Sequence, residues 1–470
     1  MNKGPKELEG RKYPARAHAL TVKNHFIQKK ADISSRSAIF ISGEDLKLYP
    51  YCDQTAPLRQ NRYFFYLSGC NIPGSHVLFD LDAELLILVL PEIDWDDVMW
   101  SGMPLSIEDA YKTFDVDKVV YLKDLQGFLS SFGKIYTTDI NDENSKFGNL
   151  LTEKDPDLFW ALDESRLIKD DYELTLMRHA SKISDNSHYA VMSALPIETD
   201  EGHIHAEFVY HSLRQGSKFQ SYDPICCSGP NCSTLHYVKN DDSMENKHTV
   251  LIDAGAEWNN YASDVTRCFP INGDWTKEHL EIYNAVLDMQ DQVMKKIKPE
   301  AHWDELHLLA HRVLIKHFLS LGIFHNGTED EIFESGVSVS FFPHGLGHLL
   351  GMDTHDVGGH PNYDDPNPLL RYLRLRRVLK ENMVVTNEPG IYFSPYLVEL
   401  GLKDDNKAKY VNKDVLEKYW YVGGVRIEDD ILVTKDGYEN FTKITSDPEE
   451  ISKIVKKGLE KGKDGFHNVV

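Results

Sequence analysis

Short apolar runs separated by turn residues fill the first third of the chain. Four of them, SAIFISG, YFFYLSG, SHVLFD and ELLILVL, lie between about residues 36 and 93, and KVVYL and GFLSSFGKIYTT follow over 117–138. Apolar runs of this length that end at Gly, Asp or Ser are typical of strands. The pattern therefore predicts a first domain of class α/β over residues 1–160.

A polar stretch without periodicity, residues 139–156, marks a boundary region. Beyond it, SRLIKDDYELTLMRHASKISDNSHYAVMSAL has apolar residues at helical spacing and predicts a long helix. Further helices are expected over 204–215, 276–297 and 303–321, and strands over 248–257, 261–269, 383–387 and 423–434. This mixture predicts an α+β domain over residues 161–445, followed by a short helix and a Lys-rich tail at 446–470.

Composition and charge narrow the choice of partners. Hydrophobic residues make up 41% of the chain and charged residues 27%, as in a globular protein. The net charge of −23 disfavours nucleic acid, because phosphate binding needs clustered Lys and Arg. No apolar run is long enough to span a membrane, and the first residues lack the apolar core of a secretory signal. We expect a cytoplasmic protein with no nucleic-acid or membrane partner.

The stretch HTVLIDAGAEWNNYASDVTRCF pairs two apolar strands around a polar turn. If the turn is centred between Trp258 and Asn259, Asp253 lies directly opposite Asp264, with Cβ atoms roughly 4.5–5.5 Å apart. Two carboxylates so close among apolar neighbours repel each other, and divalent metal ions between them would neutralise the charge. The alternative is one exposed aspartate and one in the turn, and this stretch alone favours neither.

Four histidines occur within FFPHGLGHLLGMDTHDVGGH: His344, His348, His355 and His360. His344 and His348 are four residues apart, as in zinc-binding helices, but the neighbouring proline and glycines disfavour a helix. Extended or looped backbone is expected, because glycines let the chain approach a ligand closely. The stretch predicts a binding site, although spacing does not choose between the first two histidines as metal ligand.

Two further strands carry glutamates. In NMVVTNEPGIYF an apolar strand ends at Glu388, where a Pro-Gly step turns the chain. In GGVRIEDDILVT the alternation places Arg426, Glu428 and Asp430 on one face, where Arg426 could hold the Glu428 carboxylate. Taken singly, each stretch has a simpler alternative. Glu388 could lie at the end of a surface strand, and Glu428 could lie on the solvated face of a strand.

The ordered set Asp-x(10)-Asp, HGLGH…H, NEPG and RIEDD resembles the pita-bread metallopeptidases, the fold of methionine aminopeptidase, Xaa-Pro aminopeptidase and prolidase. The resemblance covers about residues 164–445, and NRYFFYLSG resembles the creatinase-like domain that precedes the catalytic domain. It implies an α+β pita-bread domain after a smaller α/β creatinase/prolidase-like domain. It also implies two divalent metal ions per subunit, with Asp253, Asp264, His348, Glu388 and Glu428 as ligands. This oxygen-rich set favours Mn²⁺, with Zn²⁺ or Co²⁺ as alternatives.

Around the ligands the sequence is most similar to prolidase. The resemblance implies that Glu388 and His355 are catalytic, the first moving a proton and the second binding the oxyanion. It implies a substrate-binding set of His236, His355, Arg374, Arg426, His344 and Tyr222, in which Arg374 meets the carboxylate of a dipeptide. Tyr222 and Thr266 resemble partners of the two aspartates, and Trp100 weakly matches a tryptophan that reaches a neighbouring subunit's active site in relatives.

The activity implied is that of an Xaa-Pro dipeptidase, a homodimer that hydrolyses proline-containing dipeptides with a metal-bridging hydroxide. The nearest alternative is an Xaa-Pro aminopeptidase acting on longer peptides, and Arg374 as a carboxylate anchor favours the dipeptidase. Two further hypotheses are a non-catalytic pita-bread binding protein and a metal-free creatinase-like amidinohydrolase. The intact set of five ligands argues against both.

Overall fold

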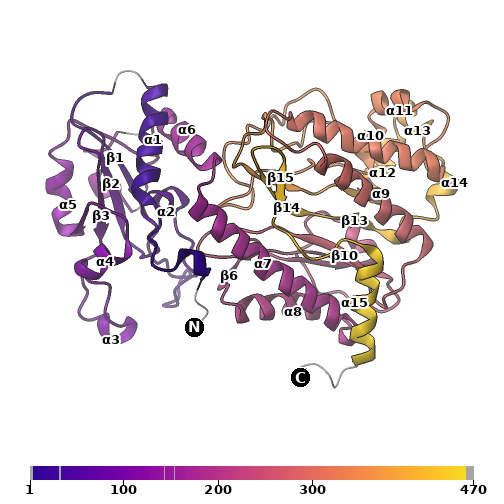
Figure 1. The fold of residues 1–470 in the computed structure, drawn as a ribbon, viewed down its shortest axis with the longest axis horizontal. Helices are drawn as coiled ribbons and strands as arrows, with labels where there is room; N and C mark the ends of the chain where they lie inside the picture. The colour runs from indigo at the N-terminus through magenta and orange to yellow at the C-terminus, as the bar shows by residue number, and fades with distance from the viewer. Residues whose placement is uncertain (1–3, 31–32, 142, 153, 462–470) are drawn as a thin grey trace. The chain divides into compact units, whose positions relative to one another are not determined.

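The computed structural model describes residues 4–30, 33–141, 143–152 and 154–461. It divides into two compact units, an N-terminal unit of Lys6–Leu167 and a C-terminal unit from Ile168 onward. Each unit has its own sheets and helices (Figure 1). The candidate site residues other than Trp100 lie in the C-terminal unit.

The N-terminal unit is a five-stranded mixed sheet with helices around it (Figure 1). Its strands, in the spatial order β4-β3-β2-β1-β5, are β1 (Ser37–Ser42), β2 (His76–Asp80), β3 (Leu85–Leu90), β4 (Lys118–Tyr121) and β5 (Lys134–Tyr136). Its helices are α1 (Ala15–Lys29), α2 (Arg62–Ser68), α3 (Val98–Ser101), α4 (Ile107–Thr113), α5 (Leu122–Leu129) and α6 (Pro156–Leu167). Leu125 and Leu129 of α5 join Phe40, Leu78 and Val89 of the sheet in one core.

One predicted strand is wrong: YFFYLSG forms helix α2. The Asn61 side chain accepts hydrogen bonds from the backbone N–H groups of Tyr63 and Phe64, which caps the start of the helix, and Gly69 with φ 65° ends it. Nearly every side chain of α2 is buried, so the helix has no polar stripe. Periodicity cannot distinguish such a helix from a buried strand. The first residues of GFLSSFG likewise belong to α5, whereas the other apolar runs form β1 to β5 as predicted.

In the C-terminal unit the strands lie between two groups of helices, α9 and α10 on one side and α7, α8 and α15 on the other (Figure 1). These helices are α7 (Asp171–Ala194), α8 (Glu201–Arg214), α9 (Lys277–Met294), α10 (Trp303–Leu321) and α15 (Pro448–Lys461), and the shorter ones are α11 (Glu329–Ser335), α12 (Pro395–Leu402), α13 (Asp405–Ala408) and α14 (Lys413–Leu416). The helices predicted over 204–215, 276–297 and 303–321 are confirmed as α8, α9 and α10, whereas the long helix predicted from Ser165 is interrupted, because SRL ends α6 and α7 begins at Asp171. Ile451 and Val455 of α15 are buried against its neighbours, and residues 462–470 of the predicted tail lie outside the described residues.

The described strands of this unit form four small sheets with the orders β10-β8-β7, β11-β14-β15, β12-β13 and β6-β9. Their bounds are β6 (Phe219–Gln220), β7 (Ile225–Ser228), β8 (Thr249–Asp253), β9 (Ala256–Glu257), β10 (Thr266–Pro270), β11 (Val384–Asn387), β12 (Gly390–Tyr392), β13 (Gly424–Arg426), β14 (Asp429–Val433) and β15 (Tyr438–Asn440). Strand pairs β11–β14 and β12–β13 are antiparallel. Because helices cover both sides, most of these strands are buried on both faces.

The predicted register of the aspartate hairpin is wrong by two residues. Asp253 lies opposite Thr266, and Trp258 pairs with Tyr261. The turn is centred between Asn259 and Asn260, whose φ angles are 47° and 67°. Asparagine tolerates this left-handed conformation better than tryptophan, so the turn excludes Trp258. A shift of two residues keeps every side chain on its own face, and the two aspartates therefore still point to the same side.

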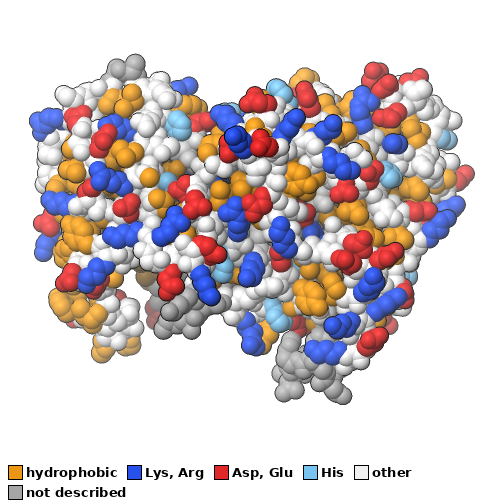
Figure 2. Space-filling model, in the orientation of Figure 1, with side chains coloured by type: hydrophobic (Ala, Val, Ile, Leu, Met, Phe, Trp, Pro, Cys, Tyr) orange, Lys and Arg blue, Asp and Glu red, His pale blue; other side chains and the backbone are white. Residues whose placement is uncertain are grey.

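The surface of the described residues carries both acidic and basic side chains. Acidic and basic side chains are interspersed over the face shown in Figure 2. Among the residues that the structure describes, no helix combines the length and apolarity needed to cross a membrane.

The hairpin depends on a close backbone approach at Gly255. A Cβ atom there would lie 1.7 Å from the Ser263 carbonyl oxygen. We expect Gly255→Ala to lower the free energy of unfolding by about 3 kcal/mol, measured by urea denaturation of metal-free protein. The matched control is Gly437→Ala, where a Cβ meets nothing within 4 Å and which should change stability by less than about 0.5 kcal/mol. Equal stability of the two variants would show that the close approach is not required.

Candidate metal centre

The five predicted ligands come from separate segments that meet in the C-terminal unit. Asp253 ends β8, Asp264 lies just before β10, His348 lies in a loop, and Glu388 and Glu428 lie between consecutive strands. Single donor atoms of Asp264, His348 and Glu428 all lie within 4.8 Å of one another. His348 Nε2 is 3.4 Å from Asp264 Oδ2 and 3.4 Å from Glu388 Oε1. The fold therefore brings together residues that lie far apart along the chain.

Tyr222 joins the remaining aspartate to this cluster. Its hydroxyl is 2.5 Å from Asp253 Oδ1 and 2.5 Å from Asp264 Oδ1. A hydroxyl has one hydrogen to donate, so it can donate to only one of these carboxylates at a time. The two aspartates therefore share one partner, as expected of side chains on the same face of the hairpin.

The expectation that Arg426 holds the Glu428 carboxylate is wrong. The Arg426 guanidinium donates to Asp253 Oδ2 at 2.7 Å and to the Tyr392 hydroxyl at 2.7 Å, and Thr266 Oγ1 donates to Glu428 Oε2 at 2.6 Å. Simple alternation requires one continuous strand, but β13 ends at Arg426 and β14 begins at Asp429. A solvated strand face is also wrong, because Arg426 and Glu428 are buried.

Burial and mutual repulsion raise the pKa of these carboxyl groups. Desolvation and the charge of Asp253 raise the pKa of Asp264 well above its ordinary value, and desolvation and three neighbouring carboxylates do the same for the pKa of Glu428. Desolvation, with the charge of Asp264, raises the pKa of Glu388 to about 7. Desolvation lowers the pKa of His348, which favours the neutral imidazole that binds metals. Four crowded carboxyls and one neutral imidazole are a donor set that fits divalent metal ions.

The HGLGH loop is extended, as predicted, and it presents His348 rather than His344. The His348 carbonyl accepts a backbone hydrogen bond from Thr386, and His348 Nδ1 lies 2.9 Å from the Leu349 carbonyl oxygen, which leaves Nε2 facing the carboxylates. A Cβ at Gly347 would lie 2.1 Å from the Thr386 carbonyl oxygen, so only glycine allows this approach. His344 Nε2 instead lies 2.9 Å from the Tyr392 hydroxyl.

The predicted substrate residues border the buried cluster. The His355 ring lies 4.5 Å from the His348 ring, and His236 and His355 are both exposed. Partial desolvation lowers the pKa of His236, and the charges of Arg374 and Arg426 lower it further, so these groups lie close enough to interact.

Two of the residues singled out in the sequence lie elsewhere. His360 is exposed and contacts Arg377, away from the cluster. Trp100 is exposed on α3 of the N-terminal unit. The predicted reach of Trp100 to a neighbouring subunit's active site stays a prediction.

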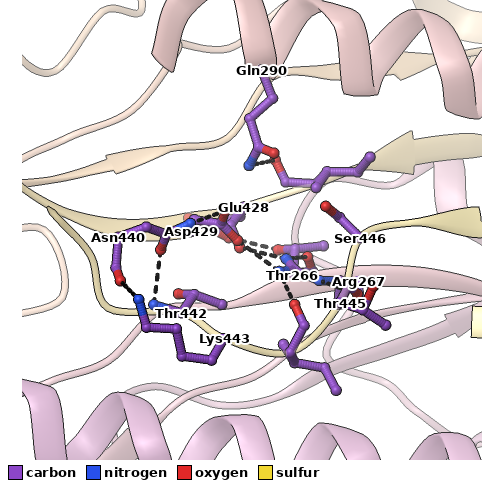
Figure 3. A network of polar contacts seen from close by, with 12 residues as sticks. Thr266, Arg267, Gln290, Glu428, Asp429, Asn440, Thr442, Lys443, Thr445 and Ser446 are labelled. Atoms are coloured by element: carbon purple, nitrogen blue, oxygen red, sulfur yellow. Dashed lines mark hydrogen bonds and ion pairs between the residues drawn. The ribbon is translucent and has the colours of Figure 1, made fainter. Parts of the chain in front are cut away.

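Sequence reasoning missed Arg267, which is buried behind Glu428 (Figure 3). Its guanidinium donates to four backbone carbonyl groups and to one carboxylate: Thr266 at 2.9 Å, Glu428 at 2.9 Å, Ile444 at 2.7 Å, Thr445 at 3.1 Å and Asp429 Oδ1 at 2.7 Å. In the sequence, a single arginine in an apolar strand looks like a residue at the edge of a sheet. The one signal that could have identified Arg267 is the alternation of polar and apolar residues in TRCF. Arg267 fixes the backbone on the far side of Glu428.

Two regions of the chain match known families. Residues 175–435 match Metallopeptidase family M24, and residues 19–139 match the N-terminal domain of aminopeptidase P. The chain belongs to metallopeptidase family M24. The predicted architecture, a pita-bread α+β domain after a smaller N-terminal domain, is confirmed. Membership of this metallopeptidase family implies a hydrolase that uses divalent metal ions.

Relatives cover almost the whole M24 chain. An uncharacterised peptidase of Saccharomyces cerevisiae is 56% identical over 479 residues, covering 100% of this chain and 89% of the relative. A probable Xaa-Pro aminopeptidase of Sordaria macrospora is 43% identical over 461 residues, covering 95% and 97%. The solved aminopeptidase PepP of Pseudomonas aeruginosa has a TM-score of 0.79 at 27% identity, covering 96% and 99%. These names support the pita-bread family and not specifically prolidase.

Metal binding should stabilise the protein more at pH 8 than at pH 5. A carboxyl whose pKa rises on folding, such as Glu388 with a pKa of about 7, keeps its proton in the folded state, so metal-free protein loses stability as pH rises from the ordinary carboxyl range through 7. Metal ions compete with these protons at pH 5 and offset carboxylate repulsion at pH 8.

The measurement is the change in melting temperature when Mn²⁺ is added to EDTA-treated protein at each pH. Asp264→Asn, which removes one predicted ligand, should lose most of the increase at both pH values. An equal increase at pH 5 and pH 8 in the wild-type protein would show that proton competition does not govern metal binding.

Proposed function

We propose that this chain is an Xaa-Pro aminopeptidase that uses two divalent metal ions to cleave the bond between an N-terminal residue and proline. The observation that carries the proposal is the buried cluster of four carboxylates and one imidazole. The probable Xaa-Pro aminopeptidase of Sordaria macrospora, which is 43% identical, supports the proline specificity. Arg374 favoured the dipeptidase when the sequence was considered alone, but these relatives favour an enzyme that acts on longer peptides.

In this proposal Asp253, Asp264, His348, Glu388 and Glu428 hold the metal ions. Such ions, when bound, supply a charge that lowers the pKa of a water molecule from about 15.7 towards 7. Carboxylate oxygens favour Mn²⁺. The solved structure of zinc-substituted E. coli aminopeptidase P supports Zn²⁺ as an alternative. We also propose, from family resemblance, a cytoplasmic homodimer.

Glu388 is the proposed proton carrier. Its carboxylate would accept a proton from water and give it to the leaving proline nitrogen. The nitrogen of any cleaved peptide bond must receive a proton to leave. Because the proline nitrogen carries no amide hydrogen, a site built to bind an ordinary amide gains nothing there, and a dedicated pocket is expected. His355, beside His348, would donate a hydrogen bond to the oxyanion, and His236 and Arg374 would hold the product side of the substrate.

Glu388→Gln should remain folded and lose hydrolysis of Gly-Pro peptides by at least about 10³-fold, because an amide cannot carry the proton. The rate is measured by chromatography of the released amino acid at saturating Mn²⁺. The control is Glu399→Gln on α12, an exposed glutamate that should keep the wild-type rate. Near-normal hydrolysis by Glu388→Gln would show that the assignment is wrong.

Substrate length distinguishes the two proline-directed activities. The aminopeptidase proposal expects Gly-Pro-Gly-Gly to be cleaved with a kcat/KM at least equal to that of Gly-Pro. A dipeptidase would cleave Gly-Pro and leave the tetrapeptide intact, and Arg374→Met would then raise the KM for Gly-Pro, because the carboxylate would lose its bidentate partner. Purified protein that binds no Mn²⁺ would favour the non-catalytic binding protein instead.

A further inference from the structure

The two predicted glutamate ligands lie at matching interruptions of the strands. Glu388 lies between β11, which ends at Asn387, and β12, which begins at Gly390. Glu428 lies between β13, which ends at Arg426, and β14, which begins at Asp429. Strand β11 pairs with β14 and β12 pairs with β13, so the two ladders stop on either side of the glutamates. One backbone hydrogen bond crosses the gap between them, from the Ile427 N–H to the Pro389 carbonyl at 3.4 Å, so few ladder bonds hold the two glutamates at a fixed separation.

Gln290 on α9 contacts the backbone immediately before both glutamates. Its side-chain Nε2 donates to the Asn387 carbonyl at 3.1 Å and to the Ile427 carbonyl at 3.3 Å. Asn387 Nδ2 returns a hydrogen bond of 3.1 Å to the Gln290 carbonyl. One amide group thus links the segment that precedes Glu388 to the segment that precedes Glu428.

Other groups hold the same two glutamates from the opposite side. The Glu388 N–H donates to the Leu346 carbonyl at 2.9 Å, and the Glu428 N–H donates to the Thr266 carbonyl at 3.1 Å. Arg267 donates to the Glu428 carbonyl at 2.9 Å. Each glutamate is therefore held between the strands and α9, and Gln290 is a contact that spans both.

A purely space-filling role would not require an amide at this position. Gln290 and Asn387 are buried, and Asn387 Oδ1 has no hydrogen-bond partner among the described residues. An apolar side chain would fill the same space but would leave the Asn387 and Ile427 carbonyls without this donor, which costs free energy because buried acceptors need partners. The pair is explained by geometry, since a planar NH₂ group offers two hydrogens at a fixed angle to two carbonyls.

We propose that Gln290 is a positioning residue that sets the separation of Glu388 and Glu428, and through it the affinity for the second metal ion. This inference rests on the proposed function, because it needs both glutamates to be ligands. Residues that orient ligands from outside the coordination shell typically change metal affinity or activity by about 10- to 100-fold when they are replaced.

The test is Gln290→Met, which keeps the length of the side chain and removes both donors. Titration calorimetry with Mn²⁺ should show the second ion binding about 10- to 100-fold more weakly. At intermediate Mn²⁺ concentration kcat should fall, whereas KM should change less than about twofold, because Gln290 is buried away from solvent. The control is Gln292→Met on the same helix, where Gln292 Nε2 donates to Asp288 at 3.1 Å, and its metal affinity should match the wild type.

Three outcomes decide the matter. Wild-type affinity and kcat in Gln290→Met, at any melting temperature, would overturn the positioning role while leaving the proposed function intact. A wild-type protein that binds no Mn²⁺ would overturn both. If Gln290→Met does not fold, Gln290→Asn keeps the amide but shortens the side chain by one methylene, and wild-type affinity in that variant would overturn the role equally.

Discussion

Repulsion among buried carboxyl groups is the constraint on which the C-terminal unit depends. Asp264 and Glu428 reach within 4.8 Å of His348, and Glu388 and Asp253 complete the group at short distances. These carboxyl groups raise one another's pKa values, because each further ionisation adds a negative charge that the existing charges repel. Cations would offset this cost, so the arrangement that is unfavourable without metal ions also favours binding them.

The fold holds these groups together with hydrogen bonds that reach both oxygens of Asp253 but only one oxygen each of Asp264, Glu388 and Glu428 among the described residues. Arg426 neutralises Asp253 from within the site, while Arg267 and Gln290 donate to backbone carbonyls at and next to the glutamates, and Arg267 also pairs with Asp429. Oxygens of the predicted ligands can therefore face the proposed metal ions. A buried arginine is tolerated because its donors have acceptors, which is the condition for burying a charge without a large penalty.

The predicted substrate residues at the border of the cluster differ from the predicted ligands in their exposure. His236 and His355 are exposed, in contrast to the buried predicted ligands, so a peptide could reach them from solvent. A site with a rigid, buried interior and an accessible border suits a reaction in which the metal ions stay and the substrate exchanges. The proline specificity proposed for this M24 chain would be decided at that border, by groups such as Arg374, and not by the ligands.

The sequence by itself determined which chemical groups are present, their order, and most of the amphipathic helices and strands, because those depend on spacing within a few residues. It also led to all five residues that converge in the site. It did not determine the helix α2, the register of the aspartate hairpin, the partner of Arg426, or the roles of Arg267 and Gln290. A helix buried on every face has no periodic signal, a turn depends on which residues accept positive φ, and the other contacts join residues about 100 or more positions apart. Only the tertiary structure brings such residues within hydrogen-bonding distance, and for that reason it alone decided how the ligands are held.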